Sequence, residues 1–294
     1  MSNHAIAMML GVLGTTVYHL SKGMQKHGID SYGLLFSWMK KELSSEEWKQ
    51  QLEKPFIYIL GMLLNGSLPI IIIISGKFAP ASYFTSMSGL GLVVLMLYST
   101  RILKEPVTKE AMLGSFILVL GTIVLGVENI YRPLIDMSKI DINRVWLFVG
   151  GYMLISLVFL AVMIRRGSIL LIGISFGLFT GFAACLDPIY KAIGQNLGGR
   201  PGYLPTTFEG WFVFVLSFLF GILSLFMTQW GFALNARASV LIPVHNSIVV
   251  IVPIIIQTLA LPGYEITYLT LIGLSLTITG ILTMNTLLTR QLAK

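Results

Sequence analysis

Asp187 is the first residue of this sequence to suggest chemistry, because it is a carboxylate inside a long apolar run. Pro188 follows it and denies the carbonyl of Ala184 its helical N–H partner. A carboxylate beside a free carbonyl offers the oxygen ligands of a cation or proton site, and Asp187 is our candidate metal ligand. The alternative is a structural role, with Asp187 solvated near a helix end and paired to Lys191 at i+4.

A second polar site is predicted around His245 and Asn246, which follow Pro243 in another apolar run. Prolines break the hydrogen-bond ladder of transporter helices around substrate sites. An imidazole can bind a metal, accept a proton or donate a hydrogen bond. An internal repeat, described below, pairs His245 with Ser86, next to Thr85. We therefore expect these side chains to bind substrate, the alternative for His245 being an interhelical hydrogen bond worth roughly 0.6 kcal/mol.

Asn65 and Gln229 complete the predicted substrate-binding set, although helix packing is the simpler interpretation of each. His19 is interpreted as a side chain that snorkels from a helix end, and Glu128 as a solvated residue at the end of its run. The sequence contains no Walker loop and no HExxH motif, and Cys185 is its one cysteine. It therefore predicts no cofactor and no enzymatic centre.

These residues are carried by nine apolar runs, each long enough for the ~20 residues of a spanning helix. The chain is 55% hydrophobic and 11% charged, far below the roughly 25% charge of soluble domains. We expect an all-α polytopic membrane protein that has the lipid bilayer as its partner. The predicted spans are 5–22, 55–76, 79–101, 109–128, 145–164, 168–190, 211–234, 238–260 and 266–288.

The net charge of +7 does not indicate nucleic acid, because the basic residues lie in the gaps between runs. With the N-terminus outside, 14 of the 20 Lys and Arg residues fall on the cytoplasmic side and 6 outside. This predicts an N-out, C-in protein of the cell (inner) membrane. Residues 23–54 are expected to form a cytoplasmic amphipathic segment. Whether Tyr32–Met39 adds a short or re-entrant tenth helix is left open.

An offset of 159 residues aligns 79–126 with 238–285 without a gap. Gly114 then meets Gly273, and Gly121 meets Gly280. The paired spans run in opposite directions, which predicts two inverted repeats that rock about a central site. The repeats are 1–128, with four spans, and 145–294, with five, joined by an external linker at 129–144. In span 168–190, the GxxxG spacing of Gly177 and Gly181 predicts close helix packing.

The repeated stretch resembles the drug/metabolite transporter superfamily of EamA-like proteins. The resemblance rests on Phe78–Ser82, Gly89-Leu90 and the turn Leu103–Thr108, followed by Gly114 and Gly121. By layout the chain is most similar to the NIPA-type magnesium transporters. It departs from them in the second span, where Pro69 and a run of isoleucines stand in place of an acidic residue.

The resemblance implies a secondary transporter that works by alternating access and carries Mg²⁺ or another divalent cation down its gradient. The alternative is an exporter or exchanger of small metabolites such as amino acids, which the scarcity of intramembrane carboxylates favours. A non-transporting scaffold or an intramembrane enzyme is the alternative of another class. The glycine-rich spans 109–128 and 266–288 are expected to be either outer scaffold or the surfaces of a homodimer.

Overall fold

The computed structural model describes residues 3–27, 53–102, 109–133, 135–166, 169–199, 202–234, 236 and 238–291. All regular structure in these ranges is helical. The expected helix at Tyr32–Met39 lies outside the described residues, as does most of the predicted amphipathic segment.

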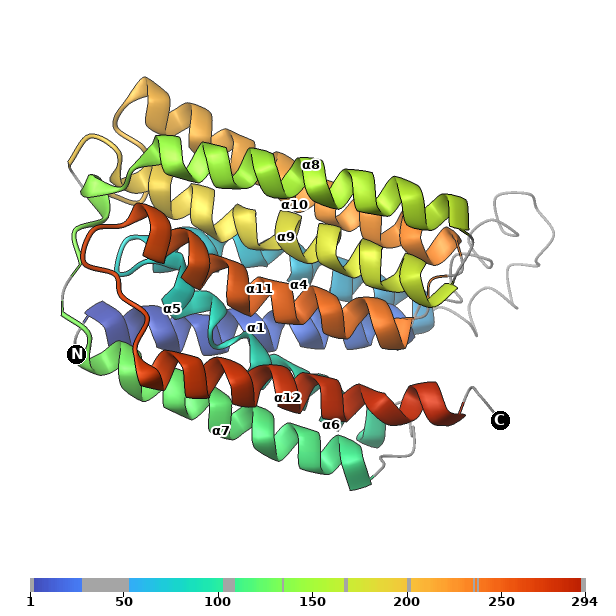
Figure 1. Cartoon of the computed structure of the whole chain (residues 1–294). Helices are drawn as coiled ribbons and strands as arrows, with labels where there is room; N and C mark the ends of the chain where they lie inside the picture. The colour runs from blue at the N-terminus through green and yellow to red at the C-terminus, as the bar shows by residue number, and fades with distance from the viewer. Residues whose placement is uncertain are drawn as a thin grey trace.

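Long helices cross the molecule back and forth, as the alternation of apolar runs and short gaps predicts (Figure 1). In chain order they are α1 (Asn3–His27), α4 (Glu53–Gly76), α5 (Ala81–Thr85), α6 (Ser88–Arg101), α7 (Lys109–Tyr131), a 3₁₀ turn η1 (Met137–Lys139), α8 (Ile142–Arg166), α9 (Ile169–Asn196), α10 (Phe208–Ala233), α11 (Ala238–Ala260) and α12 (Tyr268–Gln291). We call the end of the bundle at which α1 begins the N-side, and the end at which α12 finishes the C-side.

The length and composition of these helices make the chain an integral membrane protein. Within the described residues, six stretches are long and apolar enough to span a bilayer: Phe56–Gly76, Ala81–Tyr98, Met112–Tyr131, Ile142–Arg166, Ile169–Asn196 and Phe208–Thr228. Shorter apolar stretches cover Val244–Ala260 and Tyr268–Thr283. The number of nine spans stays a prediction.

The span expected as one helix at 79–101 is divided into α5 and α6. At the division, the amide of Met87 bonds the carbonyl of Phe84 (3.2 Å), so the turn tightens to i→i+3. The hydroxyl of Ser88 donates to the carbonyl of Thr85 (2.5 Å) and thereby competes with the backbone ladder. The single-helix prediction was wrong here because hydropathy registers apolar length and not a local run of hydroxyl side chains.

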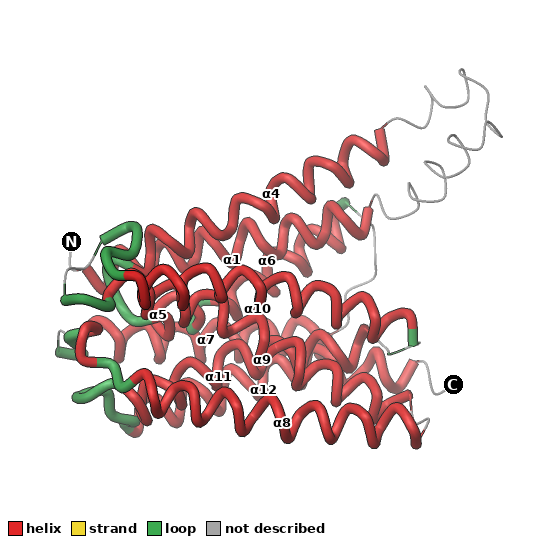
Figure 2. The backbone as a smooth tube through the Cα atoms, turned by 90° about the horizontal axis from the view of Figure 1, so that it is seen from above, coloured by secondary structure: helices red, strands yellow, loops and turns green. Residues whose placement is uncertain are grey.

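Helix α9 forms the centre of the bundle. Most of its side chains are buried, and α10 and α11 pack against it along its length (Figures 1 and 2). A Cβ atom on Gly177 would lie 2.7 Å from the carbonyl oxygen of Leu241, and one on Gly181 would lie 2.9 Å from the Cα of His245. The predicted role of these glycines in close packing is confirmed.

Helices α7 and α12 form a second tight pair, in which glycines of each helix meet the backbone of the other. A Cβ on Gly121 would lie 2.9 Å from the carbonyl oxygen of Gly273, and one on Gly280 would lie 2.8 Å from that of Gly114. The glycines of the sequence repeat therefore join the two helices within one chain.

We predict that Gly121→Leu destabilises the protein, because the leucine would have to displace the backbone of α12. Overpacking of this kind costs about 1–3 kcal/mol, so the melting temperature in detergent should fall by roughly 5 °C. Gly150→Leu on α8 is the matched control, because nothing lies within 4 Å of a Cβ there. Equal melting temperatures for the two variants would contradict the prediction.

Candidate functional site

The amide of Gln257 on α11 holds the N-side end of α5. In the orientation that satisfies both amide atoms, its oxygen accepts from the backbone N–H groups of Ala81 (2.9 Å) and Ser82 (3.0 Å), and its nitrogen donates to the hydroxyl of Ser82. The hydroxyl of Tyr264 donates to the same serine oxygen at 2.9 Å. Because the first N–H groups of a helix have no partner in the helix itself, Gln257 supplies one from a distant span.

A buried ion pair lies next to this cap, at the N-side end of α7. Glu128 is only 4% exposed and pairs with Arg132 one turn later. Its carboxylate also accepts from the hydroxyls of Thr267 (2.6 Å) and Thr270, and the guanidinium lies 4.3 Å from the ring centre of Tyr264. The interpretation of Glu128 as a solvated end residue was wrong, because the start of α12 covers it.

We use the name N-side belt for the polar side chains that meet at this end of the bundle. The belt consists of Ser82, Glu128, Arg132, Gln257, Tyr264, Thr267 and Thr270.

His245 and Asn246 lie inside the bundle on α11, both less than 9% exposed. The Nδ1 atom of His245 is 3.1 Å from the hydroxyl oxygen of Thr180 on α9. The hydroxyl of Ser224 on α10 donates to the carbonyl of Thr180 at 2.9 Å. The side-chain nitrogen of Asn246 is buried without a hydrogen-bond partner among the described residues. Three helices thus bring neutral polar groups together here.

A related arrangement joins α1 to α6. The hydroxyl of Thr15 donates to the carbonyl of Ser88 (2.9 Å), and Nδ1 of His19 lies 2.9 Å from the carbonyl oxygen of Thr15. His19 is 3% exposed, so the interpretation of a snorkelling side chain was wrong.

Asp187 is held in an ion pair between α9 and α10. Lys191, one turn later, pairs with its carboxylate and is completely buried. The ammonium also lies 4.1 Å from the ring centre of Phe218 on α10. The predicted i+4 pairing is confirmed, and it is largely enclosed by protein, with the side chain of Asp187 14% exposed.

The other predicted site residues lie in separate places. The hydroxyl of Thr85 faces the carbonyl of Ser82 (3.5 Å), and that of Ser86 donates to Tyr83 (3.2 Å) and accepts from the amide of Asn129 (3.3 Å). Asn65 accepts from Ser21 across the α1–α4 contact at 3.4 Å. The side chain of Gln229 lies outside the described part of the structure.

The structure brings α5 and α6 into contact with α11, so the helices that carry Ser86 and His245 are neighbours. Asp187 lies apart from His245: the partner of His245 on α9 is Thr180, seven residues and about 10 Å before Asp187 along the helix. Among the described residues, no three His, Cys, Asp or Glu side chains converge as metal ligands do. The role of Asp187 as a metal ligand stays a prediction.

Several polar residues of these clusters were missed from the sequence. The spacing of Glu128 and Arg132 at i+4 was a usable signal for an ion pair. Gln257 offered a weaker signal, as a single amide in an otherwise apolar stretch of α11. Thr180 offered none, because a threonine inside an apolar helix ordinarily bonds its own backbone.

Comparisons of the chain with family models, with curated proteins and with solved structures found no match.

We predict that Lys191→Met lowers the stability of the protein by about 3 kcal/mol, because it leaves the carboxylate of Asp187 buried without its partner. The double variant Asp187→Asn/Lys191→Met should recover most of the loss, since no charge is then left inside. Thermal unfolding in detergent measures both. Lys139→Met is the matched control, because its ion pair with Asp136 is exposed on both sides. A double variant as unstable as the single one would contradict this account of the pair.

Proposed function

We propose that the protein is a secondary transporter of the drug/metabolite transporter type, made of two inverted repeats that work by alternating access. The observation that carries the proposal is the position of the hydrogen bonds between the two sequence repeats. Tyr264 and Gln257 of the second repeat bond Ser82 of the first, and Thr267 and Thr270 bond Glu128. All of these contacts belong to the N-side belt.

Further contacts between the repeats lie at the same end. Gln195, near the end of α9, donates to the carbonyl of Ile73 on α4 (2.6 Å), and Asn196 donates to that of Gly76 (3.3 Å). Polar contacts of this kind can be exchanged for water, whereas close backbone packing cannot. The arrangement supports a state that is closed at the N-side, with the N-side belt as its gate. By the distribution of Lys and Arg, the N-side is the outer side.

The contact between α7 and α12 supports the inverted repeat. Under the offset of 159, Gly121 corresponds to Gly280, and Gly114 to Gly273. Gly121 meets Gly273 and Gly280 meets Gly114, so each contact is matched by its equivalent with the two helices exchanged. Reciprocal contacts of this kind are what a two-fold axis produces. The axis would run between α7 and α12, and we propose these helices as the pivot.

The buried charges favour a small neutral or zwitterionic metabolite as the substrate. The two carboxylates enclosed in the described bundle, Glu128 and Asp187, are each paired with a cation of the same helix. The other buried polar groups described above on α1, α9 and α11 are hydroxyls, imidazoles and an amide. Mg²⁺ prefers carboxylate and water oxygens, so it finds fewer suitable ligands here than a solute that exchanges hydrogen bonds does.

The experiment that tests this function is exchange in proteoliposomes. Vesicles loaded with a mixture of unlabelled amino acids should take up a labelled amino acid faster than empty vesicles. A parallel set that contains a Mg²⁺-sensitive dye measures cation entry under an inside-negative potential. Saturable Mg²⁺ entry without amino-acid exchange would establish the divalent-cation alternative. Tight vesicles that show neither flux would contradict transport of both classes.

For the transported solute, we predict that His245→Ala lowers the initial rate of exchange by about tenfold, because the substitution removes a buried polar group worth about 1–3 kcal/mol. Thr100→Ala is the control, since this threonine is exposed and donates to the carbonyl of Met96 in its own helix. An unchanged rate for His245→Ala at normal expression would remove His245 from the site while leaving the architecture in place.

We predict that Gln257→Leu loosens the gate, because it leaves the N–H groups of Ala81 and Ser82 buried without a partner. In a Cys185→Ser background, the thiol of a Ser86→Cys variant should react with a membrane-impermeant maleimide about tenfold faster when Gln257→Leu is added. Thr258→Val is the matched control, since Thr258 donates to the carbonyl of Ile254 in its own helix. Equal rates with and without Gln257→Leu would show that the amide does not hold this end closed.

A further inference from the structure

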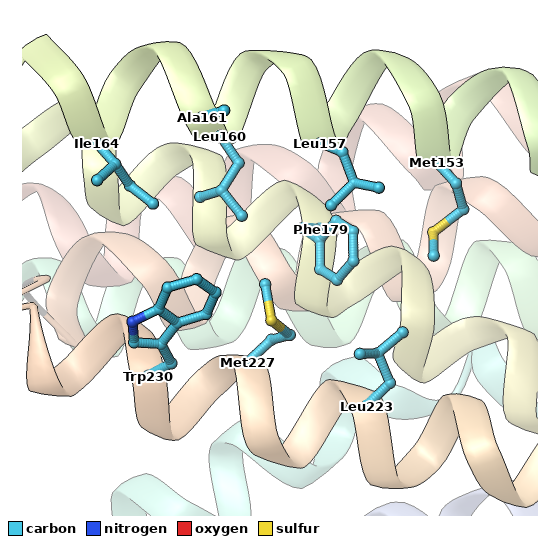
Figure 3. Close-up of a pocket in the computed structure, with 9 residues that line it drawn as sticks. All are labelled: Met153, Leu157, Leu160, Ala161, Ile164, Phe179, Leu223, Met227 and Trp230. Atoms are coloured by element: carbon cyan, nitrogen blue, oxygen red, sulfur yellow. The ribbon is translucent and has the colours of Figure 1, made fainter.

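An apolar groove runs between α8 and α10 and is floored by α9 (Figure 3). Its volume is about 380 Å³. Leu157 and Leu160 point into it from α8, Leu223 and Met227 point into it from α10, and Phe179 of α9 lies between them. The remaining lining residues are Met153, Ala161, Ile164 and Trp230.

The groove opens on a surface that faces lipid. On α8, Leu154 and Ile155 are 66% and 72% exposed, and on α10, Phe226 is 71% exposed. An exposed apolar surface of this kind on membrane-spanning helices is covered by acyl chains. Water does not fill the groove, because a site that holds water needs polar partners and these walls are apolar. An acyl chain is therefore the occupant that its chemistry allows.

The groove has a charged end. From Met153 to Ile164 it extends about 16 Å along α8, at 1.5 Å per residue. The next two residues are Arg165 and Arg166, both exposed, at the end of the helix. Trp230 lies at the same end and is half exposed, as tryptophans are at the level of lipid headgroups. The apolar walls thus end at two guanidinium groups at the C-side surface.

We propose that this groove binds one anionic glycerophospholipid, with an acyl chain against Leu157, Phe179 and Met227 and the headgroup phosphate at Arg165 and Arg166. Arginine pairs with phosphate through two parallel N–H···O bonds, which favours a headgroup of net negative charge over a zwitterionic one. Methionines at 153 and 227 adapt the walls to a flexible chain. None of the residues that line the groove belongs to the predicted substrate-binding set, so the lipid proposal does not rest on the proposed transport function.

The test is native mass spectrometry of the detergent-purified protein titrated with dioleoyl phosphatidylglycerol or dioleoyl phosphatidylcholine, which share their acyl chains. The wild-type protein should retain the first lipid at lower concentration. In the double variant Arg165→Gln/Arg166→Gln this preference should fall by up to about 30-fold, at about tenfold per 1.4 kcal/mol and roughly 1 kcal/mol per arginine. Arg101→Gln removes an exposed basic residue at the C-side end of α6 and should leave the preference for phosphatidylglycerol unchanged.

A second variant tests the groove itself. Ala161→Phe places a ring among the lining residues and should lower retention of both lipids, whereas Leu154→Phe adds bulk to the same helix outside the groove and should not. Equal retention of the two lipids by the wild-type protein would overturn the proposal. So would a loss of preference in Arg101→Gln as large as in the double arginine variant. If Ala161→Phe does not fold, the arginine variants decide alone.

Discussion

The bilayer interior offers no water to a polar group, so every donor, acceptor and charge buried in this bundle needs a partner from the protein. The polar features of the structure follow from this constraint. The start of α5 leaves the N–H groups of Ala81 and Ser82 without a partner in their own helix, and Gln257 of α11 accepts from both. The carboxylate of Asp187 is matched by the ammonium of Lys191. Where the partner comes from another helix, as with Gln257, satisfying the group also fixes which helices are neighbours.

Two kinds of contact join the repeats, and they differ in what they permit. Between α7 and α12, glycines bring two backbones together, and no side chain can be exchanged there for water. At the N-side belt, Tyr264 and Thr267 reach across with hydroxyl groups whose hydrogen bonds water can replace. If the repeats rock, the glycine contact between α7 and α12 is therefore the natural pivot, and the bonds of Gln257 and Tyr264 to Ser82 are the part that opens. The proposed mechanism uses this difference in the chemistry of the two contacts.

The sequence predicted those features that depend on near neighbours along the chain. Helix existence followed from apolar length, and the Asp187–Lys191 pair followed from a spacing of four residues. The cap at the start of α5 was missed because its partner, Gln257, lies on a distant span. Glu128 was misinterpreted for the same reason, since a residue at a helix end is solvated unless another element covers it, and here the start of α12 does. The placement of His245 opposite Thr180 likewise depends on how α9 and α11 pack.

The pairing of the buried charges bears on how a transport cycle could proceed. Arg132 follows Glu128 by one turn, directly after the last residue of α7, and Asp187 and Lys191 lie one turn apart on α9, so each pair moves with its helix as a unit. A rocking motion then carries no unpaired charge through the bilayer. A cation that bound Asp187 would have to release Lys191, and a buried charge left without its partner costs about 3–5 kcal/mol. The binding energy of the cation would have to offset that cost in every cycle. A neutral or zwitterionic solute that exchanges hydrogen bonds with His245 and Asn246 leaves both ion pairs intact.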